Sequence, residues 1–447
     1  MKIIIVGVGN VGRELVKQLS REGHDIIVVD TNTKLVEEMV NIFDVMGITG
    51  NGVSLSTMNE TGINTCDLLI ACTQYDEMNM LCCLVGKKLG AKETIARVKN
   101  REYSELFSSR ELGISMLVNP DYESALEISR LLRFPSAIKI EPFAEGRVDI
   151  IEFKVTKDSI LYNVALKDLS DVLKTKILIC AVERDGEVTI PNGNFTLIDG
   201  DKIYVTASKR GMHNFFRDLG QAQNAKKVMI IGGSRIATYL SQELAKVDVN
   251  VKIIEKSESK CALLMENLDK ATVINGDGTD RNLLVEEGLL DCDALIVLTD
   301  LDEQNIIISM HASTMGVKVI TKIDNVSYYP LLENSGIDSV VATKATTANE
   351  IIKCVRGMAN SMDSAVNKLY RIVDGKAEVL EFKVTPSFKG LSIPFSIIKL
   401  KKNTLIAGII RDGNLITPSG NDTLESNDLV LVVTLHDNFD DLNDILE

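Results

Sequence analysis

Short apolar runs alternate with amphipathic stretches along the first part of the chain. The apolar runs predict buried strands at Lys2–Val6, Ile26–Val29, Val45–Ile48, Leu68–Ala71 and Thr94–Val98. The stretches between them have the spacing of helices, at Val11–Glu22, Asn32–Ile42 and Met78–Leu89. Strands that alternate with helices form a parallel sheet with helices on both faces. The pattern therefore predicts the α/β class, with a doubly wound, Rossmann-type sheet.

A different pattern begins near residue 148, where strand-like runs are separated by turn signals. The predicted elements are strands at Val148–Val155, Ile177–Glu183, Val188–Ile190 and Lys202–Ala207 and a short helix at Leu166–Leu169. Asp185-Gly186 has the composition of a tight hairpin turn. These elements predict a small α+β module. A helix predicted at Tyr122–Leu132, with a counterpart at Thr346–Arg356, either links the two parts or packs against a neighbouring chain.

The whole pattern occurs twice. Lys2–Gly7 recurs as Lys227–Gly232, and Glu152–Thr156 recurs as Glu381–Thr385. Self-similarity with a period of about half the chain indicates a duplicated structural unit. We therefore predict two tandem Rossmann-type sheets, each followed by a small α+β module.

Charge and apolar content narrow the class of function. The 447 residues carry a formal net charge of −14. Nucleic acid is not a predicted partner, because binding to its phosphates needs clustered Lys and Arg. No apolar run approaches the ~18 residues that a membrane-spanning helix needs. We predict no direct membrane insertion, so that any role at a membrane would require a membrane-embedded partner.

The eight cysteines are predicted to be buried and reduced, as in a cytosolic protein. None belongs to a Cys-x-x-Cys motif, and the four histidines do not pair with them at the spacing of zinc sites. No metal site is predicted.

A glycine-rich segment, Gly7-Val8-Gly9-Asn10-Val11-Gly12, joins the first predicted strand to the first helix. In a dinucleotide site, the first glycine permits the tight turn, the second lets the backbone approach a pyrophosphate, and the third lets the helix pack closely. The N-terminus of the helix favours phosphate. Asp30 ends the second strand, where a carboxylate accepts bonds from both ribose hydroxyls. An acid there disfavours a 2′-phosphate, so NAD is predicted over NADP.

Further residues are predicted to lie at the same edge of the sheet, where ligands bind in such folds. Asn51 follows the third strand, near the expected adenine position, and Thr73 and Gln74 follow the fourth. Asp76 either contacts a ligand or caps the next helix. Arg97, near the end of the fifth strand, is either a phosphate partner or a surface charge.

The second copy departs from this pattern, because its loop reads Gly232-Gly233-Ser234-Arg235-Ile236-Ala237. Ala237 is tolerated in place of the last glycine, but the Cβ of Ser234 hinders the approach of a phosphate. Arg235 could offset this by supplying positive charge. The other residues predicted for this site are Glu255 in the place of the ribose acid, Asp277, Thr299 and Lys322. This site is expected to bind a different nucleotide or none.

The glycine-rich opening, the Thr-x-x-Asp-x-x-Asn loops, the Ile95-Ala96-Arg97-Val98 strand and the Arg-Asp-Gly hairpins together resemble the RCK (also called KTN) domains. Two tandem copies in one chain are similar to the regulatory subunits of Trk potassium-uptake systems. The resemblance implies N-terminal RCK domains at 1–120 and 225–343, and C-terminal RCK subdomains at 138–223 and 365–447.

The same resemblance implies a homo-oligomeric ring on the cytoplasmic side of an integral-membrane, potassium-translocating subunit of the Trk type. NAD(H), ATP or ADP would bind in the Rossmann clefts. Binding would change the angle between units and so open or close the pore.

Two other functions are alternatives to regulation. A NAD-dependent dehydrogenase would need an acid or base near the nicotinamide, and the short α+β modules offer no clear candidate. No Walker A motif is present, so ATP hydrolysis is not predicted. The second alternative is a stand-alone nucleotide sensor that uses the α+β modules as ligand pockets. The sequence favours a regulator that is not an enzyme.

Overall fold

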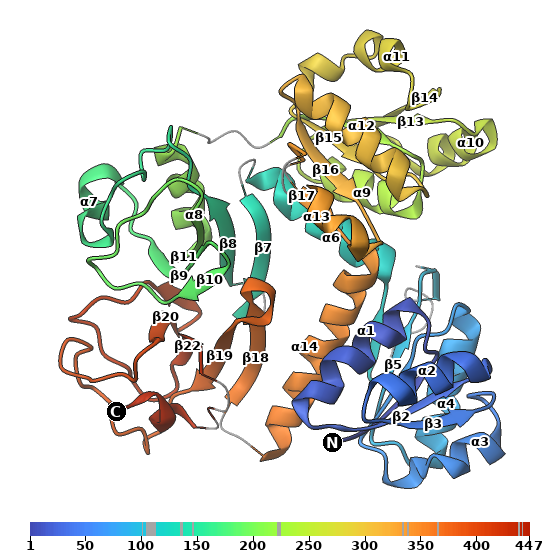
Figure 1. Ribbon diagram of the computed structural model, residues 1–447, viewed down its shortest axis with the longest axis horizontal. Helices are drawn as coiled ribbons and strands as arrows, with labels where there is room; N and C mark the ends of the chain where they lie inside the picture. The colour runs from blue at the N-terminus through green and yellow to red at the C-terminus, as the bar shows by residue number, and fades with distance from the viewer. Residues whose placement is uncertain are drawn as a thin grey trace. The chain divides into compact units, whose positions relative to one another are not determined.

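The computed structural model describes residues 1–447 except 101, 104–112, 135–136, 145–146, 221–224, 333–334, 338, 364–365, 437–438 and 440. The chain forms two compact units (Figure 1). One unit combines Met1–Ser129 with Lys226–Cys354, and the other combines Arg130–Ala225 with Val355–Glu447. Each unit therefore joins corresponding parts of the two repeats. The domain limits predicted at residues 223 and 365 lie outside the described residues.

The first unit contains two six-stranded parallel sheets. In the first repeat, the order is β3-β2-β1-β4-β5-β6. Its strands are β1 (Lys2–Val6), β2 (Asp25–Asp30), β3 (Met46–Thr49), β4 (Leu68–Ala71), β5 (Glu93–Arg97) and β6 (Met116–Val118). Its helices are α1 (Asn10–Leu19), α2 (Thr33–Ile42), α3 (Leu55–Glu60), α4 (Asp76–Leu89) and α6 (Pro120–Arg133).

The second repeat has the equivalent order, β14-β13-β12-β15-β16-β17. Its strands are β12 (Lys227–Ile231), β13 (Asn250–Glu255), β14 (Ala271–Asn275), β15 (Ala294–Val297), β16 (Lys318–Lys322) and β17 (Ser339–Val341). Its helices are α9 (Arg235–Ala245), α10 (Glu258–Asn267), α11 (Arg281–Glu286), α12 (Asp302–Thr314), α13 (Tyr329–Leu332) and α14 (Thr343–Asp363). In both sheets the order reverses beside the first strand, so right-handed crossovers place helices on both faces.

The predicted doubly wound sheets are confirmed, but the prediction of five strands in each was wrong by one. The sixth strands, β6 and β17, have three residues each. They pair in parallel with β5 and β16, with Arg97 opposite Val118 and Lys322 opposite Val341. Such short strands carry too little periodicity to be recognised in a sequence.

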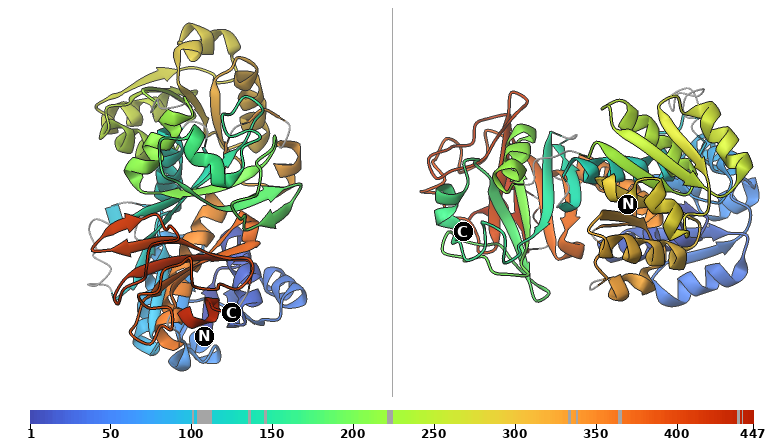
Figure 2. Two further views of the ribbon diagram at one scale, coloured as in Figure 1. Left: turned by 90° about the vertical axis from the view of Figure 1, so that its left-hand side faces the viewer. Right: turned by 90° about the horizontal axis from the view of Figure 1, so that it is seen from above.

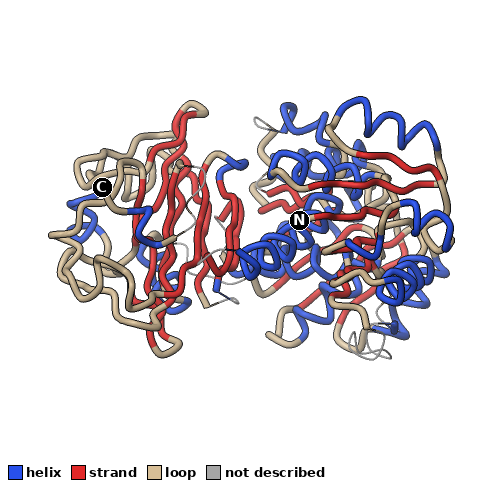
Figure 3. The backbone as a smooth tube through the Cα atoms, turned by 90° about the horizontal axis from the view of Figure 1, so that it is seen from below, coloured by secondary structure: helices blue, strands red, loops and turns tan. Residues whose placement is uncertain are grey.

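The second unit contains two five-stranded antiparallel sheets with the matching orders β10-β9-β11-β8-β7 and β18-β19-β22-β20-β21. The strands of the first are β7 (Ala137–Phe143), β8 (Val148–Lys154), β9 (Leu178–Arg184), β10 (Glu187–Thr189) and β11 (Lys202–Ala207), with helices α7 (Leu169–Val172) and α8 (Lys209–Asp218). The strands of the second are β18 (Val366–Ile372), β19 (Ala377–Lys383), β20 (Thr404–Arg411), β21 (Asn414–Ile416) and β22 (Leu429–Thr434). Figure 3 shows the contrast between these strand-rich modules and the helix-rich Rossmann domains.

The two antiparallel sheets share a hydrophobic core, and their strands lie against one another in Figure 2. Phe143 of the first module meets Tyr370 of the second, with ring centroids 4.7 Å apart. Cys180 and Leu431 belong to the same cluster and are fully buried. Burial of apolar surface from both copies therefore makes the two modules one folded body. Strand β7, which carries Phe143, and helix α8 were not predicted from the sequence.

The cysteines are free, and six of the eight are buried. Burial raises the pKa of Cys66 to about 11 and that of Cys72 to about 12. Thiols in such surroundings stay protonated and behave as small apolar side chains. Within the described residues, no helix is both long and apolar enough to cross a membrane.

An ion pair between a partly exposed arginine and a buried aspartate is repeated in the two α+β modules. Arg184, at the end of β9, donates Nε and Nη2 to the two oxygens of Asp201 at 2.7 and 2.8 Å. Asp201 is fully buried and also accepts the amide of Ile198 at 2.8 Å. Arg411 and Asp428 form the same two-bond contact in the second module. Each pair ties the hairpin to the loop before the last strand.

We predict that Asp201→Ala lowers the free energy of unfolding by about 2 kcal/mol, because it leaves the guanidinium and the Ile198 amide without their buried acceptor. Denaturation by guanidinium chloride measures the change. The control is Asp199→Ala, which removes the same charge from an exposed position two residues away. Equal losses in both variants would contradict a specific role for the pair.

Candidate nucleotide-binding sites

The first glycine loop leaves the N-terminus of its helix open. Gly7 has a φ of 95°, and a Cβ there would lie 2.8 Å from the Thr73 nitrogen, so only glycine fits. A Cβ on Gly12 would lie 2.0 Å from the Gly7 carbonyl oxygen, which shows how closely α1 approaches the turn. Around Gly9, in contrast, a Cβ would meet nothing within 4 Å. Gly9 is the N-cap of α1 and offers no side-chain cap, so free N–H groups face open space.

Asp30 holds this loop in place. Its Oδ2 accepts the Val8 amide at 2.9 Å, and its Oδ1 accepts the Asn32 amide at 2.9 Å. Val8, Val11 and Gly12 are buried, whereas Asn10 is exposed beside Gly9. The carboxylate therefore lies at the end of β2, next to the open helix terminus, as a ribose-binding acid must.

Asn79, the asparagine of the first Thr-x-x-Asp-x-x-Asn loop, was not among the predicted ligand residues, and it connects two of them. It is fully buried, and its Oδ1 accepts both the amide and the hydroxyl of Thr73 at 2.7 Å. Its Nδ2 donates to the carbonyls of Thr73 and Arg97 at 3.1 and 2.8 Å. Arg97 closes the arrangement by donating Nη1 to the Thr73 carbonyl at 3.0 Å. The repetition of this asparagine at residue 305 was the available signal.

The remaining predicted residues of the first site lie in exposed turns. Gln74 is exposed after β4, and Asn51 is exposed after β3, where its Oδ1 accepts the Val53 amide at 3.1 Å. Asp76 does not cap its helix, whose N-cap is Tyr75. Its Oδ2 accepts the amides of Lys99 and Asn100 at 2.9 and 2.8 Å, which fixes the loop after β5.

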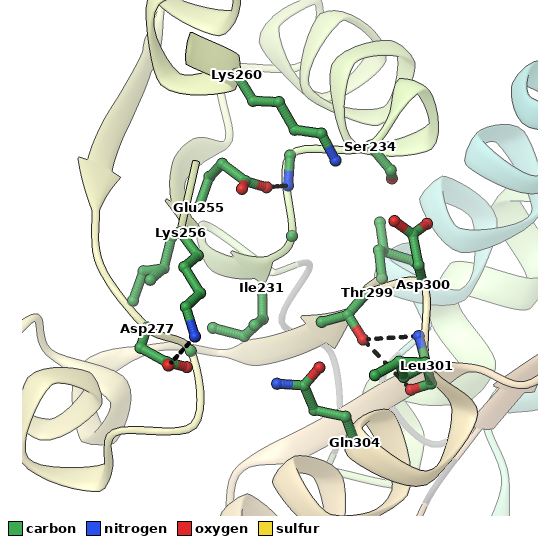
Figure 4. Close-up of a pocket in the computed structure, with 15 residues that line it drawn as sticks. Ile231, Ser234, Glu255, Lys256, Lys260, Asp277, Thr299, Asp300, Leu301 and Gln304 are labelled. Carbon is green, nitrogen blue, oxygen red and sulfur yellow. Dashed lines mark hydrogen bonds and ion pairs between the residues drawn. The ribbon is translucent and has the colours of Figure 1, made fainter. Parts of the chain in front are cut away.

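The second site is a cavity of about 260 Å³ at the equivalent edge of the second sheet (Figure 4). Its lining includes six of the predicted residues, which are Gly232, Gly233, Ser234, Glu255, Asp277 and Thr299. Lys256, Lys260, Asp300 and Gln304 also line it and were not predicted. Lys260 extends from α10 toward the glycine loop in Figure 4. The cavity thus combines apolar walls with several charged groups, as small-ligand sites do.

The second glycine loop caps its own helix. The Ser234 Oγ accepts the Ala237 amide at 3.3 Å, so one of the free N–H groups is already satisfied. Arg235 does not extend over the loop's phosphate position, because its Nε donates to the Asp121 Oδ2 at 2.9 Å. Ile236 and Ala237 are buried. This end of the cavity therefore offers fewer free N–H groups than its counterpart in the first repeat.

The other groups of the second site repeat the first. The Glu255 Oε2 accepts the Gly233 amide at 2.6 Å, and its Oε1 accepts the Ser257 amide at 2.6 Å. Lys322 takes the place of Arg97 and donates Nζ to the Thr299 carbonyl at 3.3 Å. Asp277 accepts Nζ of Lys256 at 2.8 Å. That bond, with further bonds from Thr279, lowers the pKa of Asp277 to about 2.

The sequence matches two family models, each of them twice. TrkA-N domains match at residues 3–120 and 228–343, and TrkA-C domains match at residues 150–220 and 381–447. The chain belongs to the TrkA family. Its two Rossmann domains are TrkA-N domains, and its two α+β modules contain the TrkA-C domains. The RCK resemblance seen in the sequence is thereby confirmed.

Curated relatives match over nearly their whole length. The Trk system potassium uptake protein TrkA homolog 2 of Methanosarcina mazei is 32% identical, with 97% of both chains covered. The TrkA protein of Halomonas elongata is 30% identical, with 97% of this chain and 96% of the relative covered. Among solved structures, the GsuK channel bound to NAD is 18% identical at a TM-score of 0.64, with 97% of this chain and 76% of that one covered. The likeness to GsuK shows the fold.

We predict that Lys256→Met raises the pKa of Asp277 from about 2 toward its ordinary value. The bonds from Thr279 remain, so the rise will be incomplete. Because the folded-state pKa is depressed, the pair stabilises the fold above pH ~4, and this contribution is lost as the pH falls toward 2. Carboxyl NMR titration measures the shift.

Lys260→Met is the matched control, since it removes a charge from the same cavity. An equal shift of the Asp277 pKa in both variants would show a general field effect in place of the direct bond.

Proposed function

We propose that this protein is a cytoplasmic regulatory subunit, peripheral to the membrane, that gates a Trk-type potassium-translocating subunit in response to NAD(H) or to ATP and ADP. The observation that carries the proposal is the first glycine loop, with its uncapped helix, its open space at Gly9 and Asp30 at the ribose position. Relatives named as Trk potassium uptake proteins and a channel of the same fold bound to NAD support it.

We infer the roles of the residues around the first site from its geometry. The free N–H groups at the start of α1 would bind the pyrophosphate. Asp30 would exchange its bond to Val8 for bonds to the ribose hydroxyls. Because Asn79 holds Thr73 and Arg97 together, the loops after β4 and β5 would respond to the ligand as one. A ligand can regulate in this way only if it binds two shapes of the assembly with different affinity. The protein would act as a homo-oligomeric ring and would not be an enzyme.

We predict that calorimetric titration of the full chain with NAD, NADH, ATP and ADP gives micromolar binding for at least one of them, without turnover. Asp30→Ala should weaken NAD binding by roughly tenfold or more, because the ribose hydroxyls lose an acceptor. Asp25→Ala, at the exposed start of the same strand, is the control. Unchanged NAD affinity in Asp30→Ala would remove the site assignment.

Gly9 and Ser234 occupy the same position in the two glycine loops. We predict that exchanging these two residues strengthens nucleotide binding at the second site and weakens it at the first. Ser234→Gly would free the Ala237 amide and strengthen phosphate binding at the second site by roughly fivefold, since a cap is worth about 1 kcal/mol. Gly9→Ser would weaken the first site by a similar factor. Counting sites by calorimetry in each variant measures both changes. Opposite or absent changes would refute the role given to the helix termini.

The regulatory step needs its own test. Vesicles that contain the Trk-type membrane subunit should show rubidium flux that depends on the added protein and changes with NADH or ATP. Asp30→Ala should still bind the vesicles and lose the response to NADH. If the rubidium flux with the wild-type protein does not change when nucleotide is added, a stand-alone sensor becomes the better interpretation.

A further inference from the structure

The second glycine loop is held partly by the first TrkA-N domain. Arg235, the first residue of α9, donates to the Asp121 carboxylate of α6 at 2.9 Å. One turn later, the Tyr239 hydroxyl donates to the Lys99 carbonyl at 3.2 Å. Tyr239 is buried, and its ring meets that of Tyr122 edge to face with centroids 5.7 Å apart. The start of α9, which carries Ser234 of the second cavity, therefore rests on a packed and hydrogen-bonded surface.

The same residue, Lys99, is bonded to the first site. Its backbone amide donates to the Asp76 Oδ2 at 2.9 Å, and the next amide, of Asn100, donates to the same oxygen at 2.8 Å. Asp76 begins α4, directly after the Thr73 loop of the first site. The amide of Lys99 thus contacts the first site while its carbonyl contacts the second domain. Two hydrogen bonds, joined through the backbone of Lys99, therefore connect the start of α4 to the start of α9.

The charges at this junction also come from both sites. The side chain of Lys99 is partly buried, and burial lowers its pKa, with further lowering by Arg97 and Arg235. Arg97 is the cation of the first site, and Arg235 follows Ser234 of the second. Asp121 and Asp76 act on the same ammonium in the opposite direction. A movement of either arginine therefore changes the electrostatic energy of the Lys99 ammonium that lies between them in the chain of contacts.

Among the residues that the structure describes, the chain of contacts is not repeated in the reverse direction. Gly9 aligns with Ser234, so that Asn10 and Glu14 stand where the second copy has Arg235 and Tyr239. Glu14 bonds within its own helix, to Lys17 and Gln18. The strand registers align Val118 with Val341, which places Lys344 at the position of Asp121. The residues that make the junction thus differ between copies, although the two folds are the same.

We propose that Asp76, Lys99 and Tyr239 are positioning residues through which the first nucleotide site sets the geometry of the second glycine loop. The proposal rests on the proposed function in taking both loops as ligand sites. By linkage, a ligand that orders the first loop changes the affinity of the second site, and the second ligand changes that of the first by the same factor. The packed, buried contact at Tyr239 gives this connection a physical basis.

We call the contacts through Asp76, Lys99 and Tyr239 the relay. Amide hydrogen exchange of the unliganded full chain tests the relay without any nucleotide. In wild type, the Ala237 and Thr238 amides bond to Ser234. Asp76→Ala should speed their exchange about fivefold or more, because it removes the acceptor of both the Lys99 and the Asn100 amides and so favours local opening. Asp76→Asn, which keeps an acceptor oxygen, covers the case that the alanine variant folds poorly. Glu77→Ala is the matched control, because Glu77 is the next residue and bonds to Tyr103 instead.

A double-mutant cycle with Tyr239→Phe decides whether the residues act in series. The phenylalanine keeps the packing and removes the bond to Lys99 together with the longer bond, 3.4 Å, that the hydroxyl accepts from Asn119 Nδ2. If the relay is real, Tyr239→Phe reproduces the faster exchange, and the double variant exchanges no faster than either single variant. The relay is refuted if the exchange rates of the Ala237 and Thr238 amides are unchanged in Asp76→Ala. It is also refuted if the rate increase in the double variant is the product of the two single increases. Failure of the proposed function would appear separately, as absent nucleotide binding in the wild-type protein.

Discussion

The close approach of three backbone segments at the carboxyl edge of each parallel sheet constrains the rest of the molecule. The turn after β1 contacts the end of β4, and the first turn of α1 lies on that turn, so that any Cβ on Gly7 or Gly12 would collide with backbone. The second repeat has the same constraint, since Gly232 has a φ of 97° and a Cβ there would lie 3.0 Å from the Leu298 carbonyl. Because the helix starts so close to the sheet, its free N–H groups and the loops after β3, β4 and β5 all face one space. The ligand site is a consequence of how the helix packs.

The strands that end at this edge of the sheets could be predicted from the sequence. Strands buried on both faces are apolar throughout, and the predicted bounds of β1 and β4 agree with the structure. Strand β7 has lysine, glutamate and proline among its seven residues and lies at the edge of its sheet. Edge strands tolerate such residues and so lose the alternation by which a strand is recognised. Helix α8 is strongly polar, with Gly211 near its start, and gave no apolar run to suggest it.

The positions of the site residues could be predicted, but their bonding could not. Asp30 and Glu255 follow from strand ends and spacing, because topology alone brings the ends of neighbouring strands together. The partner of Asp76 lies 23 residues away in the chain, in a loop that no motif marks. Lys260 belongs to no motif either, and only the path of α10 brings it to the second cavity. The bond between Arg235 and Asp121 joins residues 114 apart in sequence. Contacts of this kind depend on how two domains pack, which periodicity does not encode.

One side chain is enough to make the two repeats unequal. A phosphate at the first loop gains bonds from N–H groups that are otherwise left to water, whereas at the second loop it must first displace the Ser234 hydroxyl from the Ala237 amide. The displaced cap is worth about 1 kcal/mol, or roughly fivefold in affinity. Lys260 lines the second cavity, and its charge can offset part of this loss by attracting the phosphate, an effect that salt weakens. A protein with one strong and one weaker nucleotide site responds over a wider range of concentration than one with two equal sites. Duplication followed by a glycine-to-serine difference is thus sufficient, under the proposed function, to turn one sensor into two of different threshold.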